Sequence, residues 1–375
     1  MQEKEEPIRI LQVVPNMNSG GIENFIMNVY RNIDRSKVQF DFLVHYQKES
    51  FFDKEIEALG GKIYRFSVNE DYNLVKYYIE LNKFFKQHEE YKVVHGHMAS
   101  LGFLYLGAAK KNKVPVRIAH SHGTSHLKTL KGYLKYFMFK TIKYKSNVNW
   151  ACSTEAGKYL FKKRKFELIP NAIDMQKFSY NSEIREKKRK ELGIEGKFVI
   201  GNVGRFNLQK NHKFVLEIFK EIKKKEKNAV LLLVGEGELH EKIREQIKEL
   251  KLEEDVMILG VRKDTNELYQ AMDVFLLPSL FEGLPVTGIE AQTSLLKCYF
   301  SDEITKEVKI TENIHFVSLD KTAEQWAKEI LKNKDYNRQD TKIISQQFNI
   351  KVVAKELERK VSEQLKKRGQ AHEEQ

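Results

Sequence analysis

Short apolar runs alternate with longer helical patterns along the whole chain. This alternation is typical of α/β domains with parallel sheets. In the first half the expected strands are "IRILQVV" (8–14), "QFDFLVH" (39–45), "KVVHGH" (92–97), "VRIAHSH" (116–122) and "NVNWACS" (147–153). In the second half they are "KFVIGNVG" (197–204), "AVLLLVG" (229–235), "DVMILG" (255–260), "DVFLLPS" (273–279) and "LKCYFSD" (296–302). Helices are expected between them at 22–32, 52–59, 73–87, 100–112, 126–145, 211–226, 238–250, 264–271 and 286–294.

Two domains are expected, because 375 residues exceed what one ordinary core accommodates. The charged stretch "NSEIREKKRKELGIEGK" (181–197) marks the join. We place a first Rossmann-like domain at 1–178, a second at 179–348, and a C-terminal helix with a frayed tail at 349–375 that packs back on the first. Two such doubly wound domains facing across a cleft would bind a ligand at the carboxyl ends of their strands.

Composition narrows the class of protein. With 41% hydrophobic and 11% aromatic residues the chain is globular, and no apolar run approaches the roughly 20 residues that cross a bilayer. The start "MQEKEEPIRI" is too acidic and polar for a secretory signal. Only Cys152 and Cys298 are present, without CxxC spacing, which indicates a reducing cytosol and argues against structural zinc. The net charge of +13 indicates an anionic partner.

Two loops after the first strand of each half could hold an anion. "PNMNSGGIENF" (15–25) places Gly20 and Gly21 before a helix, which suits a phosphate at a helix N-terminus, although for this stretch alone an ordinary glycine turn is the better interpretation. "VGRFNLQKNH" (203–212) places Arg205 and Lys210 where a diphosphate could be neutralised, unless both are simply solvated cations.

The stretch "PSLFEGLPVTGIEA" (278–291) carries two carboxylates eight positions apart. Pro285 predicts that a helix begins close to it, so Glu282 lies in the entering loop and Glu290 on the helix. On one helix they would be roughly 12 Å apart, more than the roughly 5–9.5 Å of a glycosidase acid/base pair. Two separate tasks are therefore the better interpretation.

Histidines end two predicted strands, His95 and His97 on one and His120 and His122 on the other. Single histidines at strand ends are more often structural than catalytic, but four on neighbouring strands favour function. No HxxxH or carboxylate partner has metal-ligand spacing, so we expect no metal.

Together these stretches resemble a retaining glycosyltransferase of family 4, with the two-domain GT-B fold. The matching pieces, in order, are "NSGGIEN", "AHSHGTS", "ACSTEAGKYLF", "LIPNAIDMQKF", "NVGRFNLQKNH", "LLLVGEGELHEKI" and "SLFEGLPVTGIEAQ". The spaced glutamates with the Arg/Lys loop are specific, whereas each piece alone is weak. Among such enzymes the chain is similar to bacterial capsular and exopolysaccharide transferases.

The resemblance implies a role for each candidate. Glu282 would contact donor-sugar hydroxyls, Glu290 the nucleotide ribose, and Arg205 with Lys210 the diphosphate. His122, or less readily His120, would lie near the reacting carbon, and the backbone at Val261 and Arg262 would meet the base. The implied catalytic residues are His122, Arg205, Lys210 and Glu282. The implied donor-binding residues are Gly20, Gly21, Arg205, Lys210, Val261, Arg262, Glu282, Gly283, Leu284, Pro285, Val286 and Glu290.

The implied reaction is transfer from a nucleotide-sugar co-substrate to a lipid-linked or saccharide acceptor, with retained configuration and no required cofactor. UDP is preferred to GDP by resemblance alone. Two alternatives remain: a nucleotide-sugar epimerase of the same fold, and a non-catalytic nucleotide-sugar or membrane-binding module. The non-catalytic alternative is suggested by a difference from the family pattern, since Leu295 and Lys297 stand where a Gly-x-Pro is usual. A lost glycine cap should cost stability there.

A basic segment adds a membrane hypothesis. Residues 124–180 hold twelve Lys/Arg against three acidic residues, 12 − 3 = +9. Within it, 126–145 has apolar residues at helical intervals with lysines between them, which favours an anionic membrane surface or acceptor, or else a core-packed helix with a solvated face. The lysines concerned are Lys128, Lys131, Lys135, Lys140 and Lys143. We expect a cytoplasmic protein at the inner face of the membrane, and no nucleic-acid partner.

Overall fold

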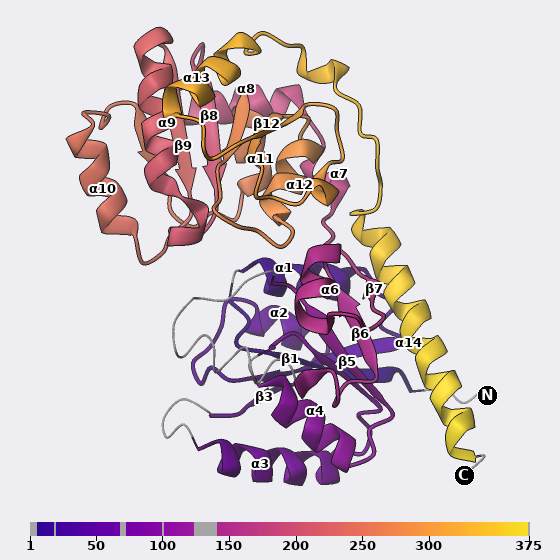
Figure 1. The fold of residues 1–375 in the computed structure, drawn as a ribbon. Helices are drawn as coiled ribbons and strands as arrows, with labels where there is room; N and C mark the ends of the chain where they lie inside the picture. The colour runs from indigo at the N-terminus through magenta and orange to yellow at the C-terminus, as the bar shows by residue number, and fades with distance from the viewer. Residues whose placement is uncertain (1–5, 19, 68–72, 100, 124–140, 374–375) are drawn as a thin grey trace. The chain divides into compact units, whose positions relative to one another are not determined.

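The computed structural model describes residues 6–18, 20–67, 73–99, 101–123 and 141–373, with side chains of the last helix described as far as residue 368. The chain forms two compact units (Figure 1). Unit 1 comprises residues 1–172 and 349–375, and unit 2 comprises residues 173–348. The chain thus leaves unit 1 between Ala172 and Ile173 and returns to it at Asn349.

Unit 1 contains a seven-stranded parallel sheet in the order β3-β2-β1-β4-β5-β6-β7. Its strands are β1 (Ile8–Val14), β2 (Val38–Val44), β3 (Ile63–Arg65), β4 (Val93–Gly96), β5 (Val116–Ser121), β6 (Val148–Ala151) and β7 (Glu167–Leu168). Its helices are α1 (Gly21–Asn32), α2 (Asp53–Ala58), α3 (Leu74–Gln87), α4 (Gly102–Lys111), α6 (Thr154–Phe161) and α14 (Ile350–Glu373).

Alternate side chains of the unit 1 strands enter two different cores. Ile10 and Val14 of β1 pack with residues of α1 and α14, whereas Leu11 and Val13 pack with residues of α3, α4 and α6. A strand that is buried on both faces reads as a continuous apolar run. The apolar side of α14 is buried in the first core through Ile350, Val353, Ala354, Leu357 and Val361. The last helix therefore belongs to unit 1, although 176 residues of unit 2 separate it from the rest of that unit in sequence.

Unit 2 contains a six-stranded parallel sheet in the order β10-β9-β8-β11-β12-β13. Its strands are β8 (Phe198–Val203), β9 (Ala229–Val234), β10 (Val256–Ile258), β11 (Val274–Leu277), β12 (Lys297–Ser301) and β13 (Ile314–Val317). Its helices are α7 (Met175–Phe178), α8 (Ser182–Glu191), α9 (His212–Lys225), α10 (His240–Glu249), α11 (Thr265–Ala271), α12 (Val286–Thr293) and α13 (Ala323–Lys332), with 3₁₀ turns η1 (Leu208–Lys210), η2 (Lys306–Val308) and η3 (Arg338–Asp340).

The prediction of two doubly wound parallel sheets is confirmed. The strand order reverses between β1 and β4 in unit 1 and between β8 and β11 in unit 2. Ligands of open parallel sheets bind beside such reversals, outside the carboxyl ends of the strands. The sequence pattern missed β3, β7 and β13 because they are short or half-buried edge strands without a long apolar run.

Candidate active site

The loop after β8 brings a lysine against the first of the two spaced glutamates. Asn207 caps the η1 turn by accepting a hydrogen bond from the backbone N–H of Lys210 at 3.1 Å. The turn directs the Lys210 ammonium to within 2.6 Å of Glu282 Oε1. The side chains of the pair are only 13% and 8% exposed, so they hold opposite charges in a largely dehydrated position. Such charge-assisted bonds are stronger and better oriented than neutral ones.

Two further donors fix the Glu282 carboxylate. Gln209 Nε2 donates to Oε2 at 3.0 Å, and Ser279 Oγ donates to Oε1 at 2.9 Å. The Gln209 side chain also donates to the Phe281 carbonyl, and the Gln209 backbone carbonyl accepts a hydrogen bond from the Leu280 N–H. These bonds join the loops after β8 and β11. Gln209 and Ser279 were not predicted from the sequence, although Gln209 directly precedes Lys210 and Ser279 lies three positions before Glu282.

Glu290 occupies a different environment, on α12. Tyr269 of α11 donates its hydroxyl to Glu290 Oε2 at 2.8 Å. Burial raises the pKa of Glu290 to about 7, against the hydrogen bond from Tyr269 and the positive charges of Lys177 and Lys210, which lower it. Its carboxyl group thus changes charge near neutral pH. Tyr269 could not be predicted from the sequence, because nothing in the pattern links two residues 21 positions apart on different helices.

α12 begins at Val286, directly after Pro285, as expected from the proline. No side chain caps its first N–H groups, and the loop before it contains Gly283 and the buried Leu284. Glu282 lies in this loop and Glu290 two turns inside the helix. The prediction that Glu282 lies in the entering loop and Glu290 on the helix is therefore confirmed.

The remaining predicted residues of unit 2 lie after β8 and β10, the strands on either side of β9. Arg205 directly follows Gly204 at the end of β8, and its side chain is 72% exposed beside Glu238 at 3.2 Å. Arg262 forms a two-point ion pair with Asp264, both distances being 2.7 Å. Val261 is 62% exposed after β10, so its backbone and side chain are accessible.

The end of α12 keeps its cap geometry in spite of the missing glycine. Leu295 adopts a left-handed φ of 59°. Its N–H donates to the Gln292 carbonyl at 2.9 Å, and that of Leu296 donates to the Ala291 carbonyl at 3.1 Å. These are the two bonds of a Schellman motif. Lys297 uses its N–H to donate to the Tyr336 hydroxyl at 2.8 Å, a bond that the usual proline could not make.

Because a side chain in this backbone conformation is strained, Leu295→Gly should be more stable than Leu295→Ala by about 1 kcal/mol. Both variants lose the leucine side chain, so their difference isolates the backbone term. Urea unfolding of the two full-length variants measures it. A Leu295→Ala protein as stable as Leu295→Gly would show that φ is not strained at this position.

The glycine loop of unit 1 lies at the start of α1. Gly20 is the N-cap residue, and α1 begins at Gly21, one residue before the predicted start. A Cβ on Gly20 would lie 2.3 Å from Glu23 Oε2, so this position requires glycine as long as Glu23 folds back over it. Nothing lies within 4 Å of a Cβ on Gly21. Burial raises the pKa of the Glu23 carboxyl.

The histidines do gather at the carboxyl ends of β4 and β5. His95, His97 and His120 are buried, and one ring nitrogen of each lies within 4.8 Å of the others. Three such nitrogens could approach a metal ion. However, five of their six ring nitrogens already make hydrogen bonds. A metal would have to break several of these bonds, so the cluster gives no argument for a metal site.

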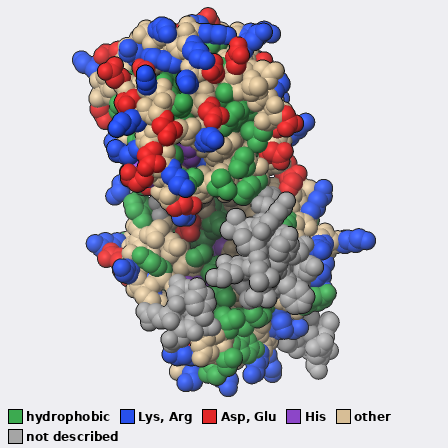
Figure 2. All heavy atoms as spheres, turned by 60° about the vertical axis from the view of Figure 1, so that its left-hand side comes forward, with side chains coloured by type: hydrophobic (Ala, Val, Ile, Leu, Met, Phe, Trp, Pro, Cys, Tyr) green, Lys and Arg blue, Asp and Glu red, His purple; other side chains and the backbone are tan. Residues whose placement is uncertain are grey.

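Residues 126–140 of the predicted basic helix at 126–145 fall outside the described residues, and with them Lys128, Lys131, Lys135 and Lys140. Lys143 is described, and its ammonium lies 5.2 Å from the centre of the Tyr144 ring. The face of unit 2 seen in Figure 2 mixes Lys and Arg with Asp and Glu, unlike the strongly positive 124–180 window. No described helix is long and apolar enough to span a bilayer.

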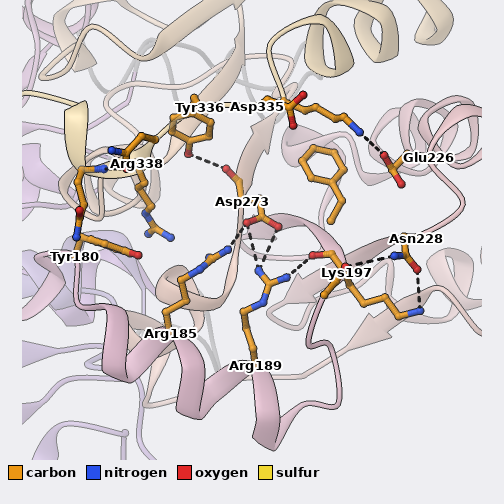
Figure 3. A pocket seen from close by; sticks show the side chains of 15 residues that line it. Tyr180, Arg185, Arg189, Lys197, Glu226, Asn228, Asp273, Asp335, Tyr336 and Arg338 are labelled. Carbon is orange, nitrogen blue, oxygen red and sulfur yellow. Dashed lines mark hydrogen bonds and ion pairs between the residues drawn. The ribbon is translucent and has the colours of Figure 1, made fainter.

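A cavity of about 680 Å³ lies at the other end of the unit 2 sheet, where β8 and β11 begin (Figure 3). Its cations already have partners. Arg185 and Arg189 converge on Asp273, and Lys334 pairs with Glu226 at 2.6 Å. Arg338 donates to the carbonyls of Tyr269, Gln270, Met272 and Ser294. These contacts anchor α8 and α11 rather than leave donors for a ligand.

Comparison with known proteins identifies the family of the chain. Residues 19–177 match the family described as "Glycosyltransferase Family 4", and residues 184–347 match "Glycosyl transferases group 1". The "Putative glycosyltransferase EpsF" of Bacillus subtilis is 36% identical over 310 residues, 80% of each chain. An Escherichia coli protein named UDP-Gal:alpha-D-GlcNAc-diphosphoundecaprenol alpha-1,3-galactosyltransferase is 31% identical over 240 residues, 61% of this chain and 62% of that protein.

Solved structures share the fold. That of Anabaena HepE, in complex with UDP and glucose, superposes with a TM-score of 0.77 at 16% identity and covers 95% of this chain and 99% of its own. Since the sheets, the spaced glutamates with their lysine, and the relatives all agree, the chain belongs to the family 4 glycosyltransferases and has the GT-B fold.

Proposed function

We propose that the chain transfers a sugar from a UDP-sugar to a lipid-linked or saccharide acceptor, with retention of configuration, during assembly of a cell-surface polysaccharide. The observation that carries this proposal is the pair of carboxylates on the loop after β11 and on α12. Glu282 pairs with Lys210 at 2.6 Å, whereas Glu290 accepts the hydroxyl of Tyr269. The names of the relatives, which include a galactosyltransferase acting on a diphosphoundecaprenol acceptor, support the donor and acceptor classes.

Each side chain would serve one part of the donor. Glu282, held by three donors, accepts hydrogen bonds from sugar hydroxyls, and Glu290 accepts those of the ribose. Lys210 and the exposed Arg205 neutralise the diphosphate as it leaves, with the backbone N–H groups at the start of α12. Positive groups set in place before the reaction stabilise the charge that develops in the transition state. This role needs no metal ion.

The other functions considered are less well supported. A nucleotide-sugar epimerase would act on the donor alone, and the relatives are named as transferases. A non-catalytic module was suggested by Leu295 and Lys297, but the α12 cap geometry persists around them and both glutamates remain in place. For a lipid-linked acceptor, the basic 124–180 window would face an anionic membrane surface at the cytoplasmic side.

Calorimetric titration with UDP and GDP, with and without magnesium, tests the proposal. UDP should bind with a Kd on the order of micromolar, independently of magnesium, and Arg205→Ala should weaken it about tenfold. Arg359→Ala is the matched control, because Arg359 is also exposed and pairs with one carboxylate, on α14. If neither nucleotide binds, even with anionic phospholipid vesicles present, the donor site is wrong. A strict need for magnesium would reject the metal-free account.

A further inference from the structure

Four histidines of unit 1 form two hydrogen-bonded pairs across β4 and β5. His95 Nε2 lies 3.1 Å from His120 Nδ1, and His97 Nδ1 lies 2.9 Å from His122 Nε2. Burial is the main cause that lowers the pKa of all four rings, to about 4 for His122, so they are neutral near pH 7. A neutral imidazole has one N–H and one lone pair. In each pair, one ring also bonds a group outside the pair through its second nitrogen. Whether that group accepts or donates therefore decides the tautomer of both rings.

The first pair has a fixed direction. His120 Nε2 lies 3.2 Å from the Ile169 carbonyl oxygen, which can only accept. His120 therefore carries its proton on Nε2 and accepts at Nδ1, so His95 also carries its proton on Nε2. Its Nδ1 has no partner among the described residues. This pair ties β4 and β5 to the segment after β7 and has no second state.

The second pair ends on a group that can face either way. His97 Nε2 lies 2.9 Å from Gln12 Oε1, on β1. With the amide oxygen toward His97, both His97 and His122 carry their protons on Nε2, and His122 Nδ1 offers a lone pair. With the NH₂ toward His97, both tautomers reverse and His122 Nδ1 becomes a donor. The orientation of one buried amide thus decides what His122 offers.

We propose that Gln12 and His97 are positioning residues, which fix His122 as the Nε2–H tautomer with Nδ1 as an acceptor. This inference rests on the proposed role of His122 near the reacting carbon. Three observations carry it. Gln12 is 1% exposed and His97 is 6% exposed, so water does not compete for these hydrogen bonds. The hydrogen bonds cross three neighbouring strands at the point where the sheet order reverses. The amide oxygen of Gln12, not its NH₂ group, lies against His97, and this contact sets the direction, since Gln12 Nε2 has no partner among the described residues. The Asn171 side chain acts the other way, because it raises the pKa of His122 and so favours a second proton on that ring.

Histidine-labelled full-length protein allows a direct test, because long-range ¹H–¹⁵N NMR correlations distinguish the two tautomers. A His122→Asn variant assigns the signals of His122. The wild type should show the Nε2–H form at His97 and His122. Gln12→Glu, whose carboxylate can only accept, should keep that form. Gln12→Met, of similar size but without a polar end, should give a mixture. Gln39→Met is the control, since Gln39 is a buried glutamine on β2 that bonds the Leu59 carbonyl instead.

Turnover gives the second measurement. Gln12→Met should lower kcat for transfer on the order of tenfold, with UDP affinity unchanged, because Gln12 is not a donor-binding residue and the side chains assigned to UDP, those of Arg205, Lys210 and Glu290, belong to unit 2. The proposal is overturned if His122 in Gln12→Met keeps the single tautomer of the wild type. It is also overturned if His122 of the wild type is in the Nδ1–H form. A changed tautomer with unchanged kcat also overturns it, while intact UDP binding would leave the donor site standing. If Gln12→Met fails to fold, a Gln12→Glu protein with the Nδ1–H form is equally decisive.

Discussion

Lys210→Met is expected to lower the rate of sugar transfer about 100-fold to 1,000-fold, the range found when one preorganised transition-state donor is removed. Lys210 lies in a largely buried pair with Glu282 and is close enough to Glu290 to lower its pKa. Its charge would stabilise the leaving diphosphate where water is largely excluded. Release of UDP from a panel of UDP-hexoses and UDP-N-acetylhexosamines measures the loss.

The same substitution leaves a buried carboxylate without its cation, so it should also destabilise the protein, by up to about 3–5 kcal/mol. A double variant, Lys210→Met with Glu282→Gln, removes that unpaired charge. We expect it to regain stability and to remain inactive. Lys213→Met, at an exposed lysine in the first turn of α9, is the control and should behave as wild type. Activity in the double variant comparable to wild type would mean that Lys210 only neutralises Glu282.

The parts of this site that the sequence could predict are those set by local periodicity. The strand at 198–203 and the helix beginning after Pro285 follow from short patterns, and they place Glu282 and Glu290 on different elements. Resemblance to the family motif could assign Arg205 and Lys210 to the same site, because both follow the strand at 198–203 within ten residues.

Contacts between distant elements could not be predicted in this way. Tyr269 meets Glu290 because α11 and α12 pack together, and that depends on the three-dimensional arrangement of the unit 2 helices. The raised pKa of Glu290 follows from the same packing. In unit 1 the sequence placed four histidines on neighbouring strand ends. It could not place Gln12 beside them, because this depends on the pairing of β1 with β4, and Gln12 and His97 are 85 positions apart in sequence.

Leu295 shows how a residue can depart from a pattern while the backbone keeps it. The sequence indicated a lost cap, since leucine stood where glycine is usual. The backbone nevertheless adopts the left-handed conformation there and makes both Schellman bonds. Surrounding contacts hold the strained residue, including the four carbonyl bonds of the buried Arg338, one of them to Ser294. Residue type alone could not distinguish an absent cap from a strained one.

Glu290 makes nucleotide binding depend on pH in a predictable direction. With the pKa of its carboxyl near 7, it is mostly protonated at pH 6 and ionised at pH 8. The ionised form accepts two ribose hydroxyls, so the affinity for UDP should fall as the pH drops through 7, and the loss should level off at about tenfold once the carboxyl is protonated. The folded carboxyl keeps its proton up to about pH 7, but an unfolded chain releases it near 4.5. Its contribution to folding stability is therefore complete below about pH 4.5 and is lost as the pH rises through 7.

Glu290→Gln isolates this effect from the titration of UDP itself, because the substitution keeps the shape and removes the charge. Calorimetry at pH 6, 7 and 8 should show that Glu290→Gln binds UDP about tenfold more weakly than wild type at pH 8, with the difference shrinking toward pH 6. Glu282→Gln should bind bare UDP as tightly as wild type and lose turnover, since Glu282 is assigned to the sugar. Parallel pH profiles for wild type and Glu290→Gln would show that this carboxyl does not titrate where nucleotide binds. If both substitutions weakened UDP binding equally, the assignment of Glu282 to the sugar and Glu290 to the ribose would be wrong.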